Sequence, residues 1–166
     1  MAQNINQTKD SAGVIAPPPL IALAAVVVGL LLDWLAPAYI LTLLLPLETR
    51  LPLGLLLIVL GCLLAYGGMR SFGRAATAVN PYASSTALAT TGVYAYVRNP
   101  MYLGLALIVG GLGIALASDW MLVMLVAAAL TIHFGVVLRE ERYLAAKFGE
   151  PYGQYCKAVS RYGWPG

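Results

Sequence analysis

The sequence predicts an all-α integral membrane protein with four transmembrane helices and amphipathic C-terminal helices on the cytoplasmic side. Composition, uncharged runs of membrane length and the placement of basic residues carry this prediction. Of the 166 residues, 60% are hydrophobic and 10% are charged, whereas a soluble domain usually has about 25% charged residues. Uncharged runs of 22, 19, 20 and 19 residues occupy 11–32, 51–69, 99–118 and 120–138. Each is close to the roughly 20 residues that a helix needs to cross hydrocarbon.

The basic residues indicate the orientation of these spans. With four spans, nine of the ten Lys and Arg residues fall on one face of the membrane, and Arg50 alone falls on the other. The positive-inside rule then places both termini in the cytoplasm, and we expect the cell inner membrane as the location. Topology and anionic membrane lipids explain the basic excess, so no nucleic acid partner is expected.

The first part of the chain is expected to contain a tail and two spans. Residues 1–16 are predicted to be a flexible cytoplasmic tail without a cleaved signal peptide. Residues 17–69 hold the first two spans, which begin after prolines that suit a helix start. Between these spans, 34–47 has only 14 uncharged residues and is broken by two prolines. We interpret it as a re-entrant or interfacial segment, with a short fifth span as the alternative.

Residues 70–166 form the second region, which we expect to carry the function. A cytoplasmic connection leads to a third span over 100–117 and a fourth over 120–138. Only Ser118-Asp119 joins these spans, so they must form an antiparallel hairpin whose cytoplasmic ends lie together. Glycines and alanines of the third span permit close helix packing. In the tail, apolar residues at helical spacings are interrupted near Gly149, which predicts two short helices on the membrane surface.

Polar residues gather where the third span begins. Arg98 offers a planar fork for a carboxylate or phosphate, although an arginine that only anchors the topology would occupy the same place. Asn99 offers a donor and an acceptor. Pro100 at the helix start leaves the preceding backbone extended. The hairpin predicts that these residues and Tyr102 lie within reach of the end of the fourth span.

Two adjacent carboxylates, Glu140 and Glu141, follow the fourth span and oppose its helix dipole. They suit a cationic amine or a ribose diol, unless Arg139 and Arg142 merely neutralise them. His133 lies seven residues before Glu140, on nearly the same face of a regular helix. An ionisable residue within a membrane span is a functional candidate, and a neutral histidine bonded to a neighbouring helix is equally compatible with the sequence.

The sequence has no metal-ligand cluster, nucleophile triad, phosphate-binding loop or dinucleotide fingerprint. Hydrolysis and phosphoryl transfer therefore lack their usual residues, and no metal site is expected. What remains is an arginine fork, paired carboxylates, an amide and many tyrosines. This set fits a zwitterionic cofactor that carries a carboxylate, an amine and a delocalised positive centre.

Two motifs resemble a known family. The stretch GVYAYVRNPMYLG at 92–104 resembles the signature of isoprenylcysteine carboxyl methyltransferases and their bacterial relatives. Glu140-Glu141-Arg142-Tyr143-Leu144, with the aromatic residues that follow it, resembles their C-terminal block. The likeness covers 70–166, and the same motifs are similar to those of membrane phosphatidylethanolamine methyltransferases, in the phospholipid methyltransferase superfamily. Many family members have histidine where this chain has Asn99, so proton transfer from that position is not expected.

The resemblance implies a methyltransferase that uses S-adenosyl-L-methionine. It places Arg98, Asn99, Pro100 and Tyr102 on one side of the cofactor and Glu140 and Glu141 on the other. Arg98 would hold the cofactor carboxylate or an acceptor carboxylate. The expected reaction is O-methylation of a lipophilic or prenylcysteine-like acceptor that enters from the bilayer.

Other readings of the sequence stay open. A phospholipid, thiol or amine acceptor would need a base, for which His133 is the catalytic candidate. Sterol reductases, which are much longer, share a related motif and would bind a nicotinamide cofactor. In another class of function, the chain would be a non-catalytic membrane scaffold or carrier whose arginines only set the topology.

Overall fold

The computed structural model of the chain describes residues 11–75 and 84–163. Every regular element within these two ranges is helical, which confirms the all-α prediction. In chain order the elements are α1 (Pro18–Leu35), α2 (Ile40–Leu44), α3 (Leu47–Arg74), a 3-10 turn η1 (Gly92–Ala95), α4 (Pro100–Leu116), α5 (Asp119–Ile132), a π-helical turn η2 (His133–Val137), α6 (Leu138–Phe148) and α7 (Glu150–Ala158).

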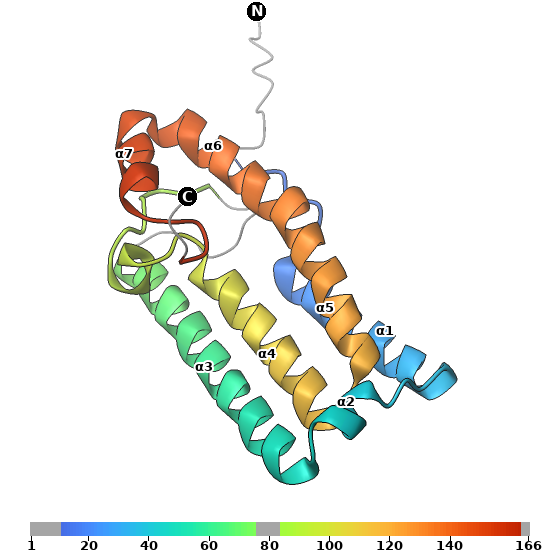
Figure 1. Ribbon diagram of the computed structural model, residues 1–166. Coiled ribbons are helices and arrows are strands. Elements are labelled where there is room, and N and C mark those ends of the chain that lie inside the picture. Colours follow the sequence, from blue (N-terminus) through green and yellow to red (C-terminus); the bar gives the residue numbers. More distant parts are fainter. Residues whose placement is uncertain (1–10, 76–83, 164–166) are drawn as a thin grey trace, which may run out of the picture.

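Helices α1, α3, α4 and α5 run along one another as a bundle (Figure 1). The α4–α5 turn and α2 lie at one end, and α6 and α7 lie at the other, which we call the polar end. Helix α3 packs mainly on α4, and α1 packs mainly on α5. The start of α4 and the end of α5 therefore both lie at the polar end, as the short predicted turn requires.

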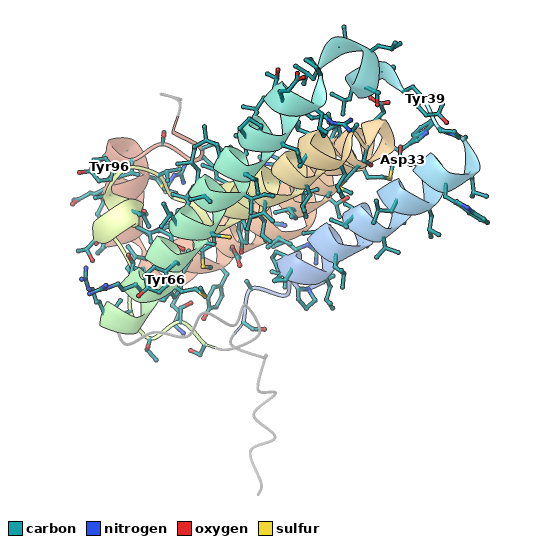
Figure 2. All side chains as sticks on the ribbon, turned by 90° about the horizontal axis from the view of Figure 1, so that it is seen from below. Asp33, Tyr39, Tyr66 and Tyr96 are labelled. Atoms are coloured by element: carbon teal, nitrogen blue, oxygen red, sulfur yellow. The ribbon has the colours of Figure 1, made fainter. Side chains whose placement is uncertain are left out.

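Three helices are long and apolar enough to cross a membrane. They are α1 with 18 residues, α3 with 28 and the continuous run Asp119–Phe148 with 30. Helix α4 is equally apolar and slightly shorter, with 17 residues. Leucine side chains project outward from α1 and α3 (Figure 2), and Leu23, Leu55 and Leu63 are more than half exposed. Such apolar outer faces are those of a membrane protein.

Glycines allow α3 and α4 to pack with their backbones in close approach. A Cβ atom on Gly61 would lie 2.6 Å from the carbonyl oxygen of Gly104, and one on Gly104 would lie 2.7 Å from that of Gly61. Gly54, seven residues before Gly61, and Gly111, seven residues after Gly104, form the same reciprocal contact. The predicted packing role of glycines in the third span is thereby confirmed.

The segment between the first two long helices contains only the five-residue helix α2. The backbone N–H groups of Ile40 and Leu41 donate to the Asp119 carboxylate at 2.8 and 2.9 Å. Five residues at 1.5 Å each cannot cross hydrocarbon about 30 Å thick. This segment therefore contains no helix long enough to be a fifth span.

Two helices are longer than the sequence predicts. Helix α3 continues to Arg74, beyond the end of the predicted second span at residue 69. Gly67 and Gly68 pack against Val93 and Met101, where a Cβ atom would lie under 3 Å from a side-chain atom. The fourth span likewise continues through η2 into α6 without a break.

Residues 11–16 pack against the bundle, although we expected them to belong to a flexible tail. Val14 is only 6% exposed and lies with Ile132 and Val136 in one core cluster. The Arg139 side chain donates to the Gly13 carbonyl at 2.8 Å. Apolar side chains that can be buried on the helices thus fix this segment, which we call the N-terminal segment. The rest of the predicted tail, 1–10, lies outside the described residues.

Candidate functional site

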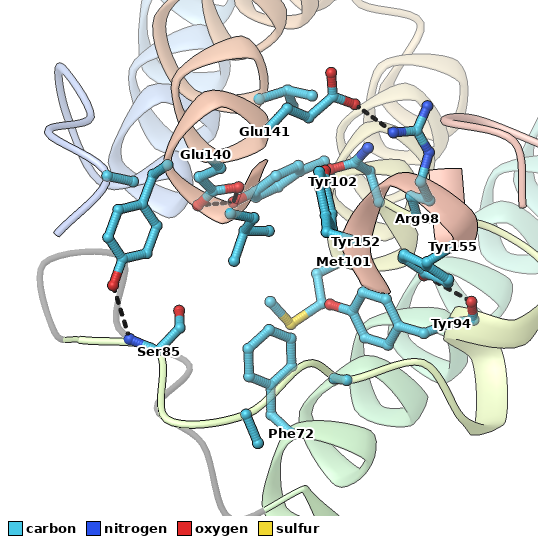
Figure 3. Close-up of a pocket in the computed structure, with 17 residues that line it drawn as sticks. Phe72, Ser85, Tyr94, Arg98, Met101, Tyr102, Glu140, Glu141, Tyr152 and Tyr155 are labelled. Carbon is cyan, nitrogen blue, oxygen red and sulfur yellow. Dashed lines mark hydrogen bonds and ion pairs between the residues drawn. The ribbon is translucent and has the colours of Figure 1, made fainter. Parts of the chain in front are cut away.

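A polar cavity of about 110 Å³ lies at the polar end of the bundle (Figure 3). It is bounded by α4, α6, α7, the connection before η1 and the N-terminal segment. Its polar side chains are those of Ser85, Arg98, Asn99, Glu140 and Glu141. Its aromatic side chains are those of Phe72, Tyr94, Tyr102, Tyr143, Tyr152 and Tyr155. Five of the predicted cofactor residues therefore lie around one cavity.

Tyr102 and Glu140 join α4 to α6 across this cavity. The Tyr102 hydroxyl lies 2.8 Å from both oxygens of the Glu140 carboxylate and donates to it. Glu140 forms no ion pair with any residue that the structure describes. Among the described residues, it is therefore the carboxylate of the site that no Lys or Arg neutralises.

Glu141 has a different role, because two arginines hold it. Arg98 Nη1 lies 3.0 Å from its carboxylate. Arg161 donates through Nε at 2.8 Å and through Nη2 at 2.7 Å, in the bidentate geometry that strengthens such pairs. The side chains of Arg98 and Glu141 are 14% and 19% exposed. Glu141 therefore links the start of α4, α6 and residues 159–163, which we call the C-terminal segment, rather than standing free for a ligand.

Arg98 still has a donor to offer. Its Nη1 group also donates to Cys156 Sγ at 2.9 Å. Its Nε atom is buried and has no hydrogen-bond partner within the described part of the chain. Because buried donors are nearly always paired, an unpaired one beside a cavity is the kind of group that a ligand satisfies.

Asn99 and Pro100 mainly fix the backbone around the site. Asn99 is 9% exposed, and its Nδ2 group donates to the Arg161 carbonyl at 3.2 Å. Pro100 occupies the first turn of α4 and is fully buried. It is absent from the cavity wall, although the resemblance places it beside the cofactor.

Aromatic side chains close the cavity on the side of α7 and η1. The Tyr155 hydroxyl donates to the Tyr94 carbonyl at 2.7 Å (Figure 3). Burial raises the pKa of Tyr155 to about 12, so its hydroxyl keeps this proton at neutral pH. Phe72 packs edge-on against Tyr94, with ring centroids 5.4 Å apart. The result is a rigid aromatic wall opposite Glu140.

Two irregular segments complete the wall. The Ser85 backbone N–H donates to the Tyr143 hydroxyl at 3.1 Å, which holds the connection before η1 on α6. Ala12 brings the N-terminal segment to the cavity, and the Ile15 backbone N–H donates to the Gly135 carbonyl at 3.3 Å. We did not predict the part played by Ala12, because a short apolar stretch before the first span carries no polar signal.

A second cavity, of about 450 Å³ and almost wholly apolar, lies between α4 and α5. Tyr102 lines this apolar cavity as well as the polar one. His133 lines only the apolar cavity, where its Nδ1 atom lies 2.8 Å from the Tyr162 hydroxyl. The π-helical turn η2 separates His133 from Glu140. It changes the helical register, so the two side chains do not share a face as a regular helix would make them.

Sequence reasoning missed Arg161 and Tyr162. Both follow α7, in a stretch without helical periodicity, and their partners lie 20 and 29 residues away. The only sequence signal was the presence of an arginine and a tyrosine beside a chain end rich in aromatic residues.

Comparison with known proteins gives one match. A family model described as phospholipid methyltransferase matches residues 49–151, which span α3 to the start of α7 and include the predicted site residues. This match confirms the resemblance to the phospholipid methyltransferase superfamily that the two motifs indicated. No curated protein and no solved structure matches the chain.

Proposed function

Because this chain belongs to the phospholipid methyltransferase family, we propose that it transfers a methyl group from S-adenosyl-L-methionine to a lipophilic acceptor. Membership of the family makes it a membrane methyltransferase. The methyl donor, the acceptor and the residues that bind them are our proposal. The single observation that carries it is the position of Tyr102, which lines both a polar cavity and an apolar one.

The side chains of the polar cavity fit the cofactor chemically. Arg98, with its unpaired buried Nε–H, would hold the cofactor carboxylate. Glu140, which no described cation neutralises, would hold the amine or the ribose hydroxyls. The tyrosines of the aromatic wall would stack on the adenine or face the positive sulfur. When bound, the cofactor supplies an electrophilic methyl group on that sulfur.

The cavity is small for a whole cofactor. Its volume of about 110 Å³ is below the roughly 300–1,000 Å³ of most ligand pockets. Helices form most of its wall, and the irregular segments 11–16 and 84–89, which belong to no helix, complete it. We propose that these segments separate when the cofactor binds.

The residues contribute to the reaction mainly by alignment. Methyl transfer is an in-line displacement, and holding two reactants in line can lower a barrier by roughly 7–11 kcal/mol. Tyr102 lines both cavities and is hydrogen-bonded to Glu140, so this pair would fix the relative positions of donor and acceptor. Exclusion of water by the apolar cavity would protect the reactive methyl group.

The acceptor would enter the apolar cavity sideways from the bilayer. Val126 and Leu130 line that cavity and are also exposed on the outer face of α5. The motif resemblance favours O-methylation of a prenylcysteine-like carboxylate, with Arg98 as catalytic residue. The description of the matching family favours a phospholipid amine instead, and an amine or thiol acceptor would pass its proton to His133.

We propose that α1, α3, α4 and α5 all cross the inner membrane, with both termini in the cytoplasm. The basic residues support this orientation, because those of α6, α7 and the end of α3 lie at the polar end. Arg50 lies near the start of α3, at the opposite end. The polar cavity would then face cytoplasmic cofactor.

Binding of S-adenosylmethionine to the purified protein in detergent tests the proposal, measured by isothermal titration calorimetry. We expect micromolar affinity. Arg98→Ala should weaken it about ten- to a hundredfold, since a hydrogen bond to a charged group contributes about 1.5–3 kcal/mol. Glu140→Ala should weaken it comparably.

Matched controls separate binding from folding. Arg142→Ala and Glu150→Ala remove the same charges from exposed positions outside the cavity and should leave the affinity unchanged. Arg98→Lys keeps the charge without the fork and should give an intermediate loss. A folded wild-type protein that binds no S-adenosylmethionine would leave a scaffold or carrier as the better explanation.

A further inference from the structure

The apolar cavity has polar side chains at one end only. Of the described residues that line it, Tyr102, His133 and Tyr162 alone have polar groups, and all three lie towards the polar end of the bundle. The Tyr102 hydroxyl donates its hydrogen bond to Glu140 and therefore has no proton to donate to a ligand. This leaves His133 and Tyr162, joined by their 2.8 Å hydrogen bond, as the polar pair that faces the cavity.

With a neutral imidazole, this pair presents one donor and one acceptor in either tautomer. If His133 Nδ1–H donates to the Tyr162 oxygen, then Nε2 accepts and the tyrosine O–H can donate. If the tyrosine O–H donates to Nδ1 instead, then Nε2–H donates and the tyrosine oxygen accepts. Nε2 forms no hydrogen bond to any other residue in the described ranges. The pair thus complements a group that both donates and accepts.

The surroundings of the pair disfavour a charged ligand group, because they offer it no charged partner. No Lys, Arg, Asp or Glu among the described residues lines the apolar cavity. Arg161 is bonded to Glu141, and Arg98, whose Nε atom has no described partner, lines only the polar cavity. Contact with the apolar walls costs an ionised group part of its hydration, and no charged side chain of this cavity compensates for that loss.

The C-terminal segment holds Tyr162 in place. The Ser160 carbonyl accepts from the Arg98 backbone N–H at 2.9 Å, and the Arg161 carbonyl accepts from Asn99. The Arg161 side chain donates two hydrogen bonds to the Glu141 carboxylate. Tyr162 is therefore fixed before any ligand binds, which lowers the entropic cost of recognition.

We propose that the His133–Tyr162 pair binds the polar head of an amphiphile whose head is uncharged and protic, namely a hydroxyl, a thiol or a neutral amine. The apolar chain of the ligand lies between α4 and α5. This inference rests on the proposed function and deepens it, because it names the acceptor class and selects against a carboxylate. The pair is a head-group subsite that neither the motifs nor the family match assigns.

Binding of two amphiphiles of equal chain length tests the subsite. Radiolabelled 1-dodecanol or dodecanoate is added to the full-length protein in lipid nanodiscs, and the bound label is measured. The label bound by protein-free nanodiscs is subtracted. We expect dodecanol to bind at least about tenfold more tightly than dodecanoate, which corresponds to about 1.4 kcal/mol of binding free energy. His133→Phe and Tyr162→Phe should each remove most of this preference, while circular dichroism stays unchanged.

A filled cavity provides the control. Ala129 lines the cavity and is exposed on α5, so Ala129→Trp should abolish dodecanol binding. Val123, which is half exposed on the same helix and outside the cavity wall, should tolerate the same substitution without effect. Equal binding of dodecanoate and dodecanol, or a preference that survives both Phe substitutions, would overturn the subsite.

The dodecanol measurement and the S-adenosylmethionine measurement together distinguish the head-group subsite from the proposed function. If the protein prefers dodecanol but binds no S-adenosylmethionine, the subsite stands and the proposed function fails. If it binds S-adenosylmethionine and shows no head-group preference, the proposed function stands and the subsite fails.

Discussion

Tyr102 borders the polar cavity and the apolar cavity at once. Its hydroxyl reaches both oxygens of Glu140 in the polar cavity, and its ring forms part of the apolar cavity. The sequence predicts Tyr102 at the site, because a tyrosine in the first turn of a span lies at the polar mouth of that helix. It does not predict the second cavity, which depends on how α4 and α5 diverge.

Removal of the Tyr102 hydroxyl should destabilise the protein. Tyr102→Phe leaves the half-buried Glu140 carboxylate without its partner, at a cost of about 1–3 kcal/mol. The thermal unfolding midpoint in detergent, followed by circular dichroism, should therefore fall. Tyr96→Phe is the matched control, because Tyr96 is 82% exposed and its hydroxyl is solvated. Equal midpoints for the two variants would show that the Tyr102–Glu140 bond contributes nothing.

Glu140 and Glu141 show what residue spacing can and cannot predict. Both were expected at the cofactor, because two carboxylates at a helix end need a cationic partner. The structure gives Glu141 two arginines and Glu140 only a tyrosine. The difference depends on Arg161, whose position is set by the path of the chain after α7, and no periodic pattern encodes that path.

At the scale of elements, the α3–α4 pair is fixed by glycines in matching positions. Gly54 and Gly61 on α3 meet Gly111 and Gly104 on α4, so the backbones touch where a side chain would separate them. Within a membrane, packing of small residues is a main source of helix association. The spacing of seven residues on both helices is visible in the sequence, but the pairing needs the fold.

Addition of one methyl group at this contact should lower stability. Gly61→Ala places a Cβ atom 2.6 Å from a backbone oxygen of α4, and overpacking of this kind costs about 1–3 kcal/mol. Gly73→Ala on the same helix meets no atom within 4 Å and should be neutral or stabilising by up to about 1 kcal/mol. Midpoints of thermal unfolding compare the two. A Gly61→Ala protein at least as stable as Gly73→Ala would contradict the close packing.

The π-helical turn η2 explains why the sequence misplaced His133. Regular helical geometry over 133–140 puts His133 and Glu140 on nearly one face, whereas η2 changes the register between them. Gly135 within this turn also accepts from the N-terminal segment. A turn of this kind arises from tertiary contacts rather than from a local residue pattern.

At the scale of the molecule, hydrophobic runs predicted the class and the order of the long helices. Their charge-free lengths, the short Ser118-Asp119 turn and the two motifs were sufficient to bring Arg98, Tyr102 and Glu140 together. The sequence did not show which residues outside the helices line the two cavities. The segments 11–16 and 84–89 complete the polar cavity, and Tyr162 lines the apolar one. Tertiary contacts position these irregular segments, and no periodic pattern encodes them.

The whole account depends on methyl transfer to a lipophilic acceptor. The purified protein in nanodiscs is given S-adenosylmethionine labelled in the methyl group, together with a membrane lipid extract. We expect label in the organic phase, with the rate reduced at least about tenfold by Arg98→Ala and unchanged by Arg142→Ala. Identification of the labelled product then gives the acceptor. Label that stays on the donor, or that moves only to water-soluble acceptors, would contradict the account.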